Sequence, residues 1–84
     1  MKLKDGKPGT TYEVREICTD DSEMEKFLFS LGCYSGEPVT VISNKKNGCI
    51  VCIRDGRYSL DKQLSEAVII CNQYRAPLFL IHAS

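Results

Sequence analysis

Two cysteines, Cys49 and Cys52, stand three positions apart in the stretch GCIVCIR. This spacing is half of a common zinc site, and it also occurs in redox-active cysteine pairs. A structural zinc site needs four ligands. The chain offers no second close pair, and the remaining soft ligands are scattered over Cys18, Cys33, Cys71 and His82. The spacing alone leaves three possibilities: a metal site, a redox site, or a strand that holds two thiols.

The residues between the two cysteines, Ile50 and Val51, are among the strongest strand formers. Because side chains alternate across a strand, an offset of three puts Cys49 on one face and Cys52 on the other. Binding one metal ion would require a tight turn that Ile-Val does not favour. We therefore expect a strand with one inward and one outward thiol. Cys52, together with Cys33 in a turn, remains the candidate for contact with a metal ion.

The other polar residues indicate no catalytic site. The chain has one histidine, His82, which we expect to be a solvated tail residue. An acidic cluster at Asp20, Asp21, Glu23 and Glu25 is expected to cap a helix, with weak binding of a divalent cation as the alternative. There is no phosphate-binding glycine loop and no nucleophile beside a base. The sequence therefore predicts a binding module and no enzyme.

One amphipathic helix is predicted over residues 19–32. Met24, Phe27, Leu28 and Leu31 follow the i, i+3, i+4, i+7 spacing of a buried stripe. Gly32 can adopt the left-handed conformation that ends a helix. We expect the four apolar side chains to lie in the core.

Short strands make up most of the remaining chain. Alternating or apolar segments predict strands at residues 10–17, 38–43, 49–54, 57–60 and 68–72. Asn47-Gly48 and Asp55-Gly56 are hairpin signals, and Asp61 can cap a helical turn over residues 61–67. The predicted fold is mainly β: a small, bent, five-stranded antiparallel barrel with one covering helix.

Composition limits the kinds of partner. The formal net charge of the 84 residues is zero, whereas a nucleic-acid binder usually carries a clear basic excess. No apolar run approaches the roughly 18 residues of a membrane span. The basic residues of MKLKDGKPG precede no apolar stretch, so no signal peptide is predicted. We expect a cytoplasmic protein with free thiols.

Three segments resemble the FeoA family. The first is LKDGKPGTTYEVREI, with Leu3, Gly9, Val14 and Ile17 at matching positions. The second is FLFSLGCYSGEPVTVIS, where the matching residues are Leu28, Leu31, Gly32, Gly36, Val39 and Val41. The third is CIVCIRDGRYSLDKQLSEAVII, with Leu60, Ala67 and Ile70. The segment from Leu60 to Ala67 is longer than the usual spacing, Ser35 replaces a usual proline, and five cysteines are more than the family leads us to expect.

The resemblance implies an SH3-like barrel over residues 1–73, followed by a tail at 74–84 that packs on the domain or on a partner. It implies a cytoplasmic accessory of ferrous iron transport that acts on the G-protein domain of a FeoB-type membrane permease. No catalytic or ligand residue carries over from the family. Since SH3-like barrels bind peptides along exposed grooves, we expect the contact surface at Tyr34, Arg54, Arg57 and Tyr58.

Two other functions remain open. The first is direct binding of Fe²⁺ or another divalent transition metal ion by exposed thiols, with Cys52 and Cys33 as the ligands. The second is a nucleic-acid-binding barrel, which the zero net charge disfavours. A homodimer is compatible with either function and with the transport role.

Overall fold

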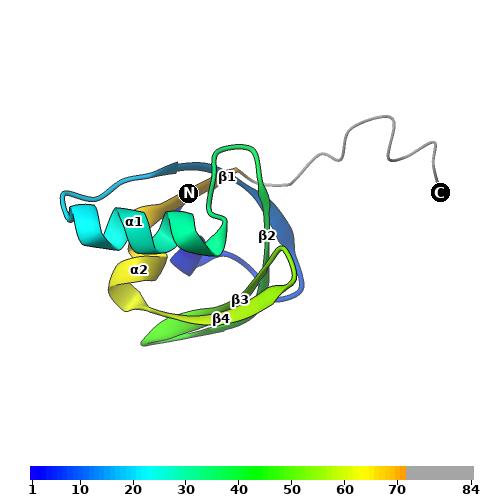
Figure 1. Cartoon of the computed structure of the whole chain (residues 1–84). Helices are drawn as coiled ribbons and strands as arrows, with labels where there is room; N and C mark the ends of the chain where they lie inside the picture. The colour runs from blue at the N-terminus through cyan, green and yellow to red at the C-terminus, as the bar shows by residue number, and fades with distance from the viewer. Residues whose placement is uncertain (72–84) are drawn as a thin grey trace, which may run out of the picture.

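The structure is a computed structural model that describes residues 1–71. In chain order the elements are η1 (Leu3–Asp5), β1 (Thr11–Ile17), α1 (Ser22–Leu31), β2 (Pro38–Lys45), β3 (Gly48–Ile53), β4 (Gly56–Asp61), α2 (Lys62–Ala67) and β5 (Val68–Cys71) (Figure 1). The predicted tail at 74–84 lies outside the described residues, as does the end of the predicted domain at residue 73.

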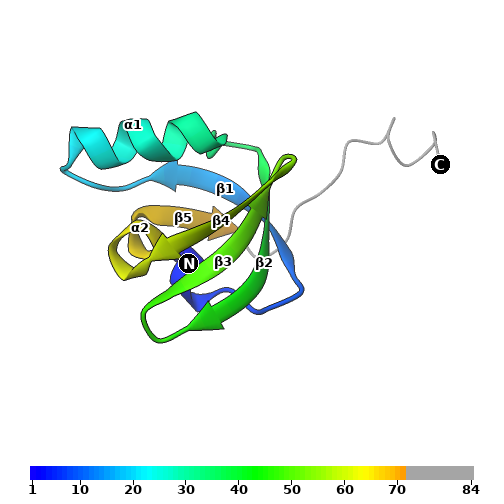
Figure 2. The same ribbon diagram turned by 60° about the horizontal axis from the view of Figure 1, so that its bottom comes forward.

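All five strands form one antiparallel sheet in the order β4-β3-β2-β1-β5. The pairing register shifts between Val14 and Glu16 in β1, and between Val41 and Ser43 in β2. Such bulges bend a strand and increase its twist. The sheet therefore curls around its inner face, and α2 connects the two edge strands (Figure 2). The predicted five-stranded antiparallel barrel with one covering helix is confirmed.

The core lies inside the curled sheet. Burial alternates along β3, where Cys49, Val51 and Ile53 are buried while Ile50 and Cys52 are partly exposed. The same alternation in the neighbouring strands completes one apolar cluster. Its members are Leu3, Tyr12, Val14, Leu28, Cys33, Val39, Val41, Cys49, Val51, Ile53, Leu60, Ala67, Val68 and Ile70.

Helix α1 begins at Ser22, three residues later than predicted, and ends at Leu31 before the predicted Gly32. The Asp21 carboxylate accepts hydrogen bonds from the backbone N–H groups of Glu23 and Met24, at 3.0 and 3.2 Å. Leu28 is fully buried, and Met24 and Leu31 pack partly against the core. Phe27, however, is 47% exposed, so its predicted place in the core is wrong. Phe27 lies about 100° around the helix from Leu28. Only one stripe of α1 side chains packs against the end of this small barrel.

Both hairpins turn one residue earlier than the glycine signals predict. Lys45 pairs with Gly48 and Ile53 pairs with Gly56, so the loops are residues 46–47 and 54–55. The glycines are instead required for space. A Cβ at Gly48 would lie 2.2 Å from the carbonyl oxygen of Leu60, and a Cβ at Gly56 would lie 2.2 Å from the Tyr58 hydroxyl.

The described part of the chain contains no helix with the length and apolar character needed to cross a membrane.

Candidate interaction site at the end of α1

The ring of Tyr34 is contacted by an aromatic side chain and by an arginine. Phe29, near the end of α1, stacks on Tyr34 with ring centroids 5.6 Å apart and an interplanar angle of 10°. The Arg54 guanidinium carbon lies 5.6 Å from the centroid of the Tyr34 ring. The Glu37 carboxylate receives a hydrogen bond from Arg54 Nη2 at 3.5 Å. We call Phe29, Tyr34, Glu37 and Arg54 the Tyr34 patch.

The loop between α1 and β2 holds Tyr34 in place. Gly32 ends α1 in the left-handed conformation, with φ of 106°. The Glu37 N–H donates to the Tyr34 carbonyl at 3.0 Å, and the Gly36 N–H donates to the Val14 carbonyl at 2.7 Å. These hydrogen bonds close the turn and tie it to β1, so the ring is presented from a fixed backbone.

Arg54 reaches this loop from a strained turn. Its φ is +55°, and it is the only non-glycine residue with positive φ among residues 1–71. Positive φ in a two-residue hairpin loop favours glycine. A left-handed conformation costs a non-glycine residue about 1–2 kcal/mol. The turn therefore aims the Arg54 side chain across the end of α1 at a cost in stability.

Gly32 makes room for that side chain. A Cβ at this position would lie 2.9 Å from Arg54 Nε and 3.2 Å from Ile53 Cγ2. Glycine at position 32 is thus favoured by its backbone conformation, and it lies against the side chain of Arg54.

The contacts of Arg54 contribute a free energy of the same order as the strain in its turn. An exposed cation–π contact contributes about 0.5–1 kcal/mol. A surface ion pair contributes about 0–1 kcal/mol. Residues held in strained backbone conformations are concentrated at functional sites. This makes the Tyr34 patch the strongest candidate for a functional surface in the described chain.

The four residues predicted to form one contact surface do not lie together. Tyr34 and Arg54 meet in the patch. Tyr58 pairs with Val51 on the inner face, is half-buried against the core, and has its hydroxyl beside Gly56. Arg57 pairs with Cys52, so it lies on the outer face of the sheet. Strand alternation places Arg57 and Tyr58 on opposite faces of β4, and the predicted contact surface as a whole stays a prediction.

Sequence reasoning missed Phe29 and Glu37, the other two members of the patch. Phe29 is 36% exposed and lies just outside the buried stripe of α1. An aromatic residue beside that stripe and three positions before the helix-ending glycine was a signal that could have found it. Glu37 gave no comparable signal, because its partner is 17 positions away in sequence.

Cys49 and Cys52 lie on opposite faces of β3, as their spacing predicts. Cys49 is buried, and its Sγ lies 3.2 Å from the Ser65 hydroxyl oxygen. Burial raises the pKa of the Cys49 thiol, and the hydrogen bond with Ser65 opposes that effect. Cys52 is partly exposed, with its Sγ 3.8 Å from the Arg54 carbonyl oxygen. The two sulfurs point to opposite sides of the sheet.

Cys33 does not have the partial exposure that was predicted for it. The residue is fully buried, because the left-handed Gly32 directs the chain inward and the Cys33 N–H donates to the Leu28 carbonyl at 3.1 Å. Burial raises the pKa of the Cys33 thiol from 9.0 to about 11. Cys33 is therefore not an exposed thiol, and contact of Cys52 with a metal ion stays a prediction. Among residues 1–71 no three histidine, cysteine or acidic side chains are grouped to hold a metal ion; His82 lies outside that range.

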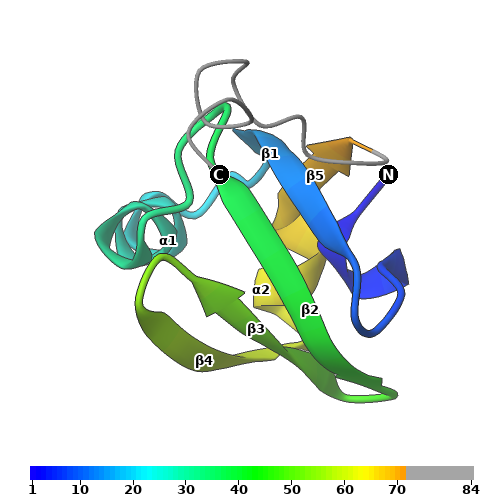
Figure 3. The same ribbon diagram turned by 90° about the vertical axis from the view of Figure 1, so that its right-hand side faces the viewer.

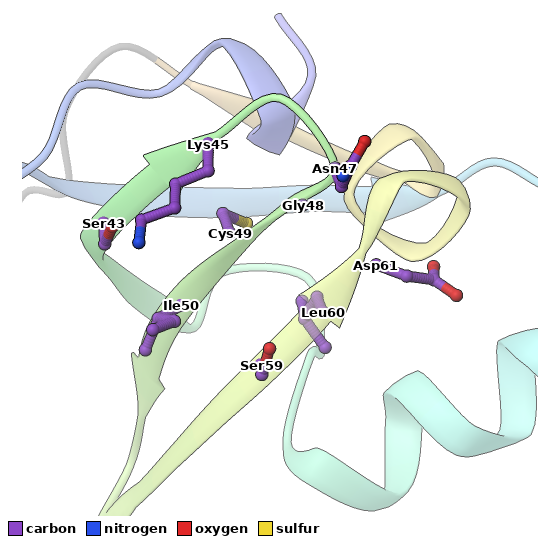
Figure 4. A pocket seen from close by; sticks show the side chains of 9 residues that line it. All are labelled: Ser43, Lys45, Asn47, Gly48, Cys49, Ile50, Ser59, Leu60 and Asp61. Atoms are coloured by element: carbon purple, nitrogen blue, oxygen red, sulfur yellow. The ribbon is translucent and has the colours of Figure 1, made fainter.

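A hollow of about 340 Å³ lies at the end of the β2–β3 hairpin beside β4 (Figure 4). Ile50 lies between Ser43 on β2 and Ser59 on β4, and Lys45 borders the hollow. None of the residues predicted to bind a partner or a metal lines it. We assign it no role.

Comparison with known proteins identifies the family. A family model described as the FeoA domain matches residues 1–71.

The chain belongs to the FeoA family.

Solved structures agree with this assignment at the level of fold. A crystal structure of an iron uptake regulatory protein, FeoA, superposes with a TM-score of 0.75 at 22% identity, covering 83% of this chain and 93% of that one. Zinc-complexed FeoA from Stenotrophomonas maltophilia, described as a prokaryotic SH3 domain protein, has a TM-score of 0.76 at 18% identity, covering 84% and 89%. A manganese-dependent transcriptional repressor has a TM-score of 0.76 at 19% identity, covering 83% and 40%. No curated protein sequence in the comparison matched.

The residues that carried the FeoA resemblance hold the fold. Gly32 and Gly36 have positive φ at the two bends of the α1–β2 loop. Leu31 packs partly against the core. The others are buried: Leu28, Val39, Val41, Leu60 and Ala67. The motif residues of this FeoA chain are thus structural parts of an SH3-like fold, and its functional surface is sought outside them.

Proposed function

We propose that this FeoA chain binds the cytoplasmic G-protein domain of a FeoB-type ferrous iron permease and acts there as a non-enzymatic adaptor. The observation that carries the proposal is the Tyr34 patch. It presents two stacked aromatic rings and an arginine from a fixed loop and a strained turn, outside the residues that hold the fold.

The chemistry of the patch suits protein binding. Tyrosine, phenylalanine and arginine are enriched in protein interfaces, and tyrosine and arginine dominate the residues whose truncation costs most. Arg54 is already oriented by Tyr34 and Glu37, so less side-chain freedom is lost when a partner binds. Its guanidinium is the donor best matched to a partner carboxylate.

This role places the protein in the cytoplasm, where the G-protein domain of the permease lies. It requires no bound metal ion in the adaptor itself, and the ferrous ion is the cargo of the permease.

A calorimetric titration of the permease G-protein domain with this protein tests the proposal. Arg54→Ala removes the guanidinium from the patch, and Arg57→Ala removes the same group from the outer face three positions away. We expect wild type and Arg57→Ala to bind alike, and Arg54→Ala to bind about 10-fold more weakly or worse. Absence of binding by the wild type, or equal loss in both variants, would reject the Tyr34 patch as the site.

A further inference from the structure

Strand β4 is a free edge of the sheet. It pairs with β3 on one side, and its other side faces no strand within residues 1–71 (Figure 3). Beyond β3, the element that packs most against β4 is α2, which follows it directly in the chain. The opposite edge, β5, is partly covered, because Lys2 forms a bridge with Ile69 and the Ile70 N–H donates to the Met1 carbonyl at 2.7 Å. Within the described chain the β4 edge has no such cover.

Strand β4 also lacks the features that keep a free edge from pairing. Natural edge strands are blunted by proline, lysine, bulges or inward-pointing charges. The six residues of β4 include no proline and no lysine, and its pairing with β3 runs without a register shift. Both bulges of the sheet lie in β1 and β2 instead. The edge is therefore free to accept another strand.

The β3–β4 hairpin determines which backbone groups of β4 face this edge. Its two-residue loop closes on the pair Ile53 and Gly56, so these two residues exchange backbone hydrogen bonds. Hydrogen-bonded and non-hydrogen-bonded pairs alternate along an antiparallel ladder. Every second residue counted from Gly56 therefore directs its N–H and C=O toward β3, whereas Arg57 and Ser59 direct theirs to the free edge. Within residues 1–71 these outward groups have no backbone partner.

The charges of β4 are self-complementary about Ser59. Arg57 lies two residues before Ser59 and Asp61 two residues after it, and all three are exposed. Within one molecule the two charges are about 13 Å apart along the strand, too far for an ion pair. Neither belongs to an ion pair among the described residues. One oxygen of Asp61 caps α2 by accepting from the Leu64 N–H at 2.8 Å, which leaves the other oxygen available.

A second copy that pairs antiparallel and is centred on Ser59 satisfies both patterns at once. Each Arg57 then lies opposite Asp61 of the other copy, and opposite charges at such cross-strand positions are stabilising. The same register opposes the two Ser59 residues, whose N–H and C=O groups face the shared edge. A register centred on Tyr58 would instead set Asp61 opposite Asp55, two like charges.

We propose that two copies of this chain pair through their β4 edges, antiparallel and centred on Ser59, so that the two sheets join across a twofold axis. Such an isologous contact uses the same strand on both molecules and closes after two copies. One added strand buries little surface, so the dimer is weak and forms at high protein concentration. The contact involves this chain alone, so it does not depend on the proposed binding to the permease.

Sedimentation equilibrium of the full-length chain over a concentration series tests the proposal, with two matched variants of Ser59. Ser59→Pro removes the outward N–H and no hydrogen bond to β3, and an edge strand accepts proline at such a position. Ser59→Ala removes the hydroxyl and keeps the N–H. Arg57→Glu reverses one charge of each cross-copy pair and leaves the backbone unchanged. Amide spectra by nuclear magnetic resonance at low concentration verify that each variant is folded.

We expect the wild type and Ser59→Ala to dimerise alike, Ser59→Pro to stay monomeric, and Arg57→Glu to dimerise about 10-fold more weakly or worse. The wild-type amide signals of Ser59 and Asp61 should shift with concentration more than that of Tyr58, which faces β3. A wild type that stays monomeric at millimolar concentration would overturn the proposal. A dimer that survives Arg57→Glu unchanged, or concentration-dependent shifts centred on Tyr34 in place of Ser59, would also overturn it.

Discussion

Two substitutions of Arg54, one to alanine and one to glycine, separate the effect of its strained turn on stability from the effect of its side chain on binding. Arg54→Ala removes the contacts with Tyr34 and Glu37 but keeps a side chain at φ of +55°. Arg54→Gly removes the same contacts and also the strain. Relief of a left-handed conformation contributes about 1–2 kcal/mol. The greater freedom of glycine in the unfolded chain costs about 0.4–1 kcal/mol.

The glycine variant should therefore be more stable than the alanine variant by about 0.5–1 kcal/mol. In a domain of this size that difference corresponds to about 2–8 °C in melting temperature. Urea denaturation monitored by circular dichroism measures the difference directly. Both variants should bind the permease domain equally weakly, because both lack the guanidinium. Equal stability of the two variants would refute the strain argument, and retained binding by Arg54→Gly would refute the role of the side chain.

Three further outcomes follow from the geometry. Gly48→Ala should lower the free energy of unfolding by about 2 kcal/mol or more, because its Cβ would collide with the Leu60 carbonyl oxygen. Gly9→Ala is the control: with φ of +83° and open space around it, this substitution should lower the free energy of unfolding by about 1 kcal/mol. Equal losses for the two variants in urea titrations would contradict the steric explanation. In the folded protein, iodoacetamide should label Cys52 at least 100-fold faster than Cys33, whose raised pKa alone reduces its thiolate about 100-fold. Slower labelling of Cys52 in the presence of ferrous iron or zinc would support the prediction that this thiol contacts a metal ion. The pKa of Cys33 is higher in the folded state than in the unfolded state. The free energy of unfolding should therefore be constant below pH 9 and fall by about 2–3 kcal/mol as the pH rises to 11. If Cys33→Ala loses as much stability over this range, another group is responsible.

The sequence was most informative where burial depends on periodicity. The alternation along β3 predicted the separation of Cys49 and Cys52, and the spacing along α1 predicted the burial of Leu28. These patterns are local, since each side chain's face follows from its position in one element. The order of strands and turns was sufficient to indicate a five-stranded barrel.

Features that depend on contacts between distant segments were not predictable in this way. Gly48 reads as a turn residue, yet a Cβ there would collide with the Leu60 carbonyl oxygen on β4. Cys33 in a turn read as exposed, but the turn folds into the core.

The Tyr34 patch was likewise not predictable from the sequence. Its four members come from α1, the α1–β2 loop and the β3–β4 turn, which only the closed barrel brings together. Arg54 and Arg57 were indistinguishable by residue type and neighbourhood. The register of β3 with β4 separates them, since it places Arg57 opposite Cys52 on the outer face.

Chemical-shift mapping of the isotope-labelled chain against the unlabelled permease G-protein domain tests the adaptor account most directly. The account predicts that the perturbed signals centre on Tyr34 and Arg54 and spare Ile50 and Cys52 on the outer face. Perturbation centred on the outer face, with Tyr34 and Arg54 unchanged, would contradict it.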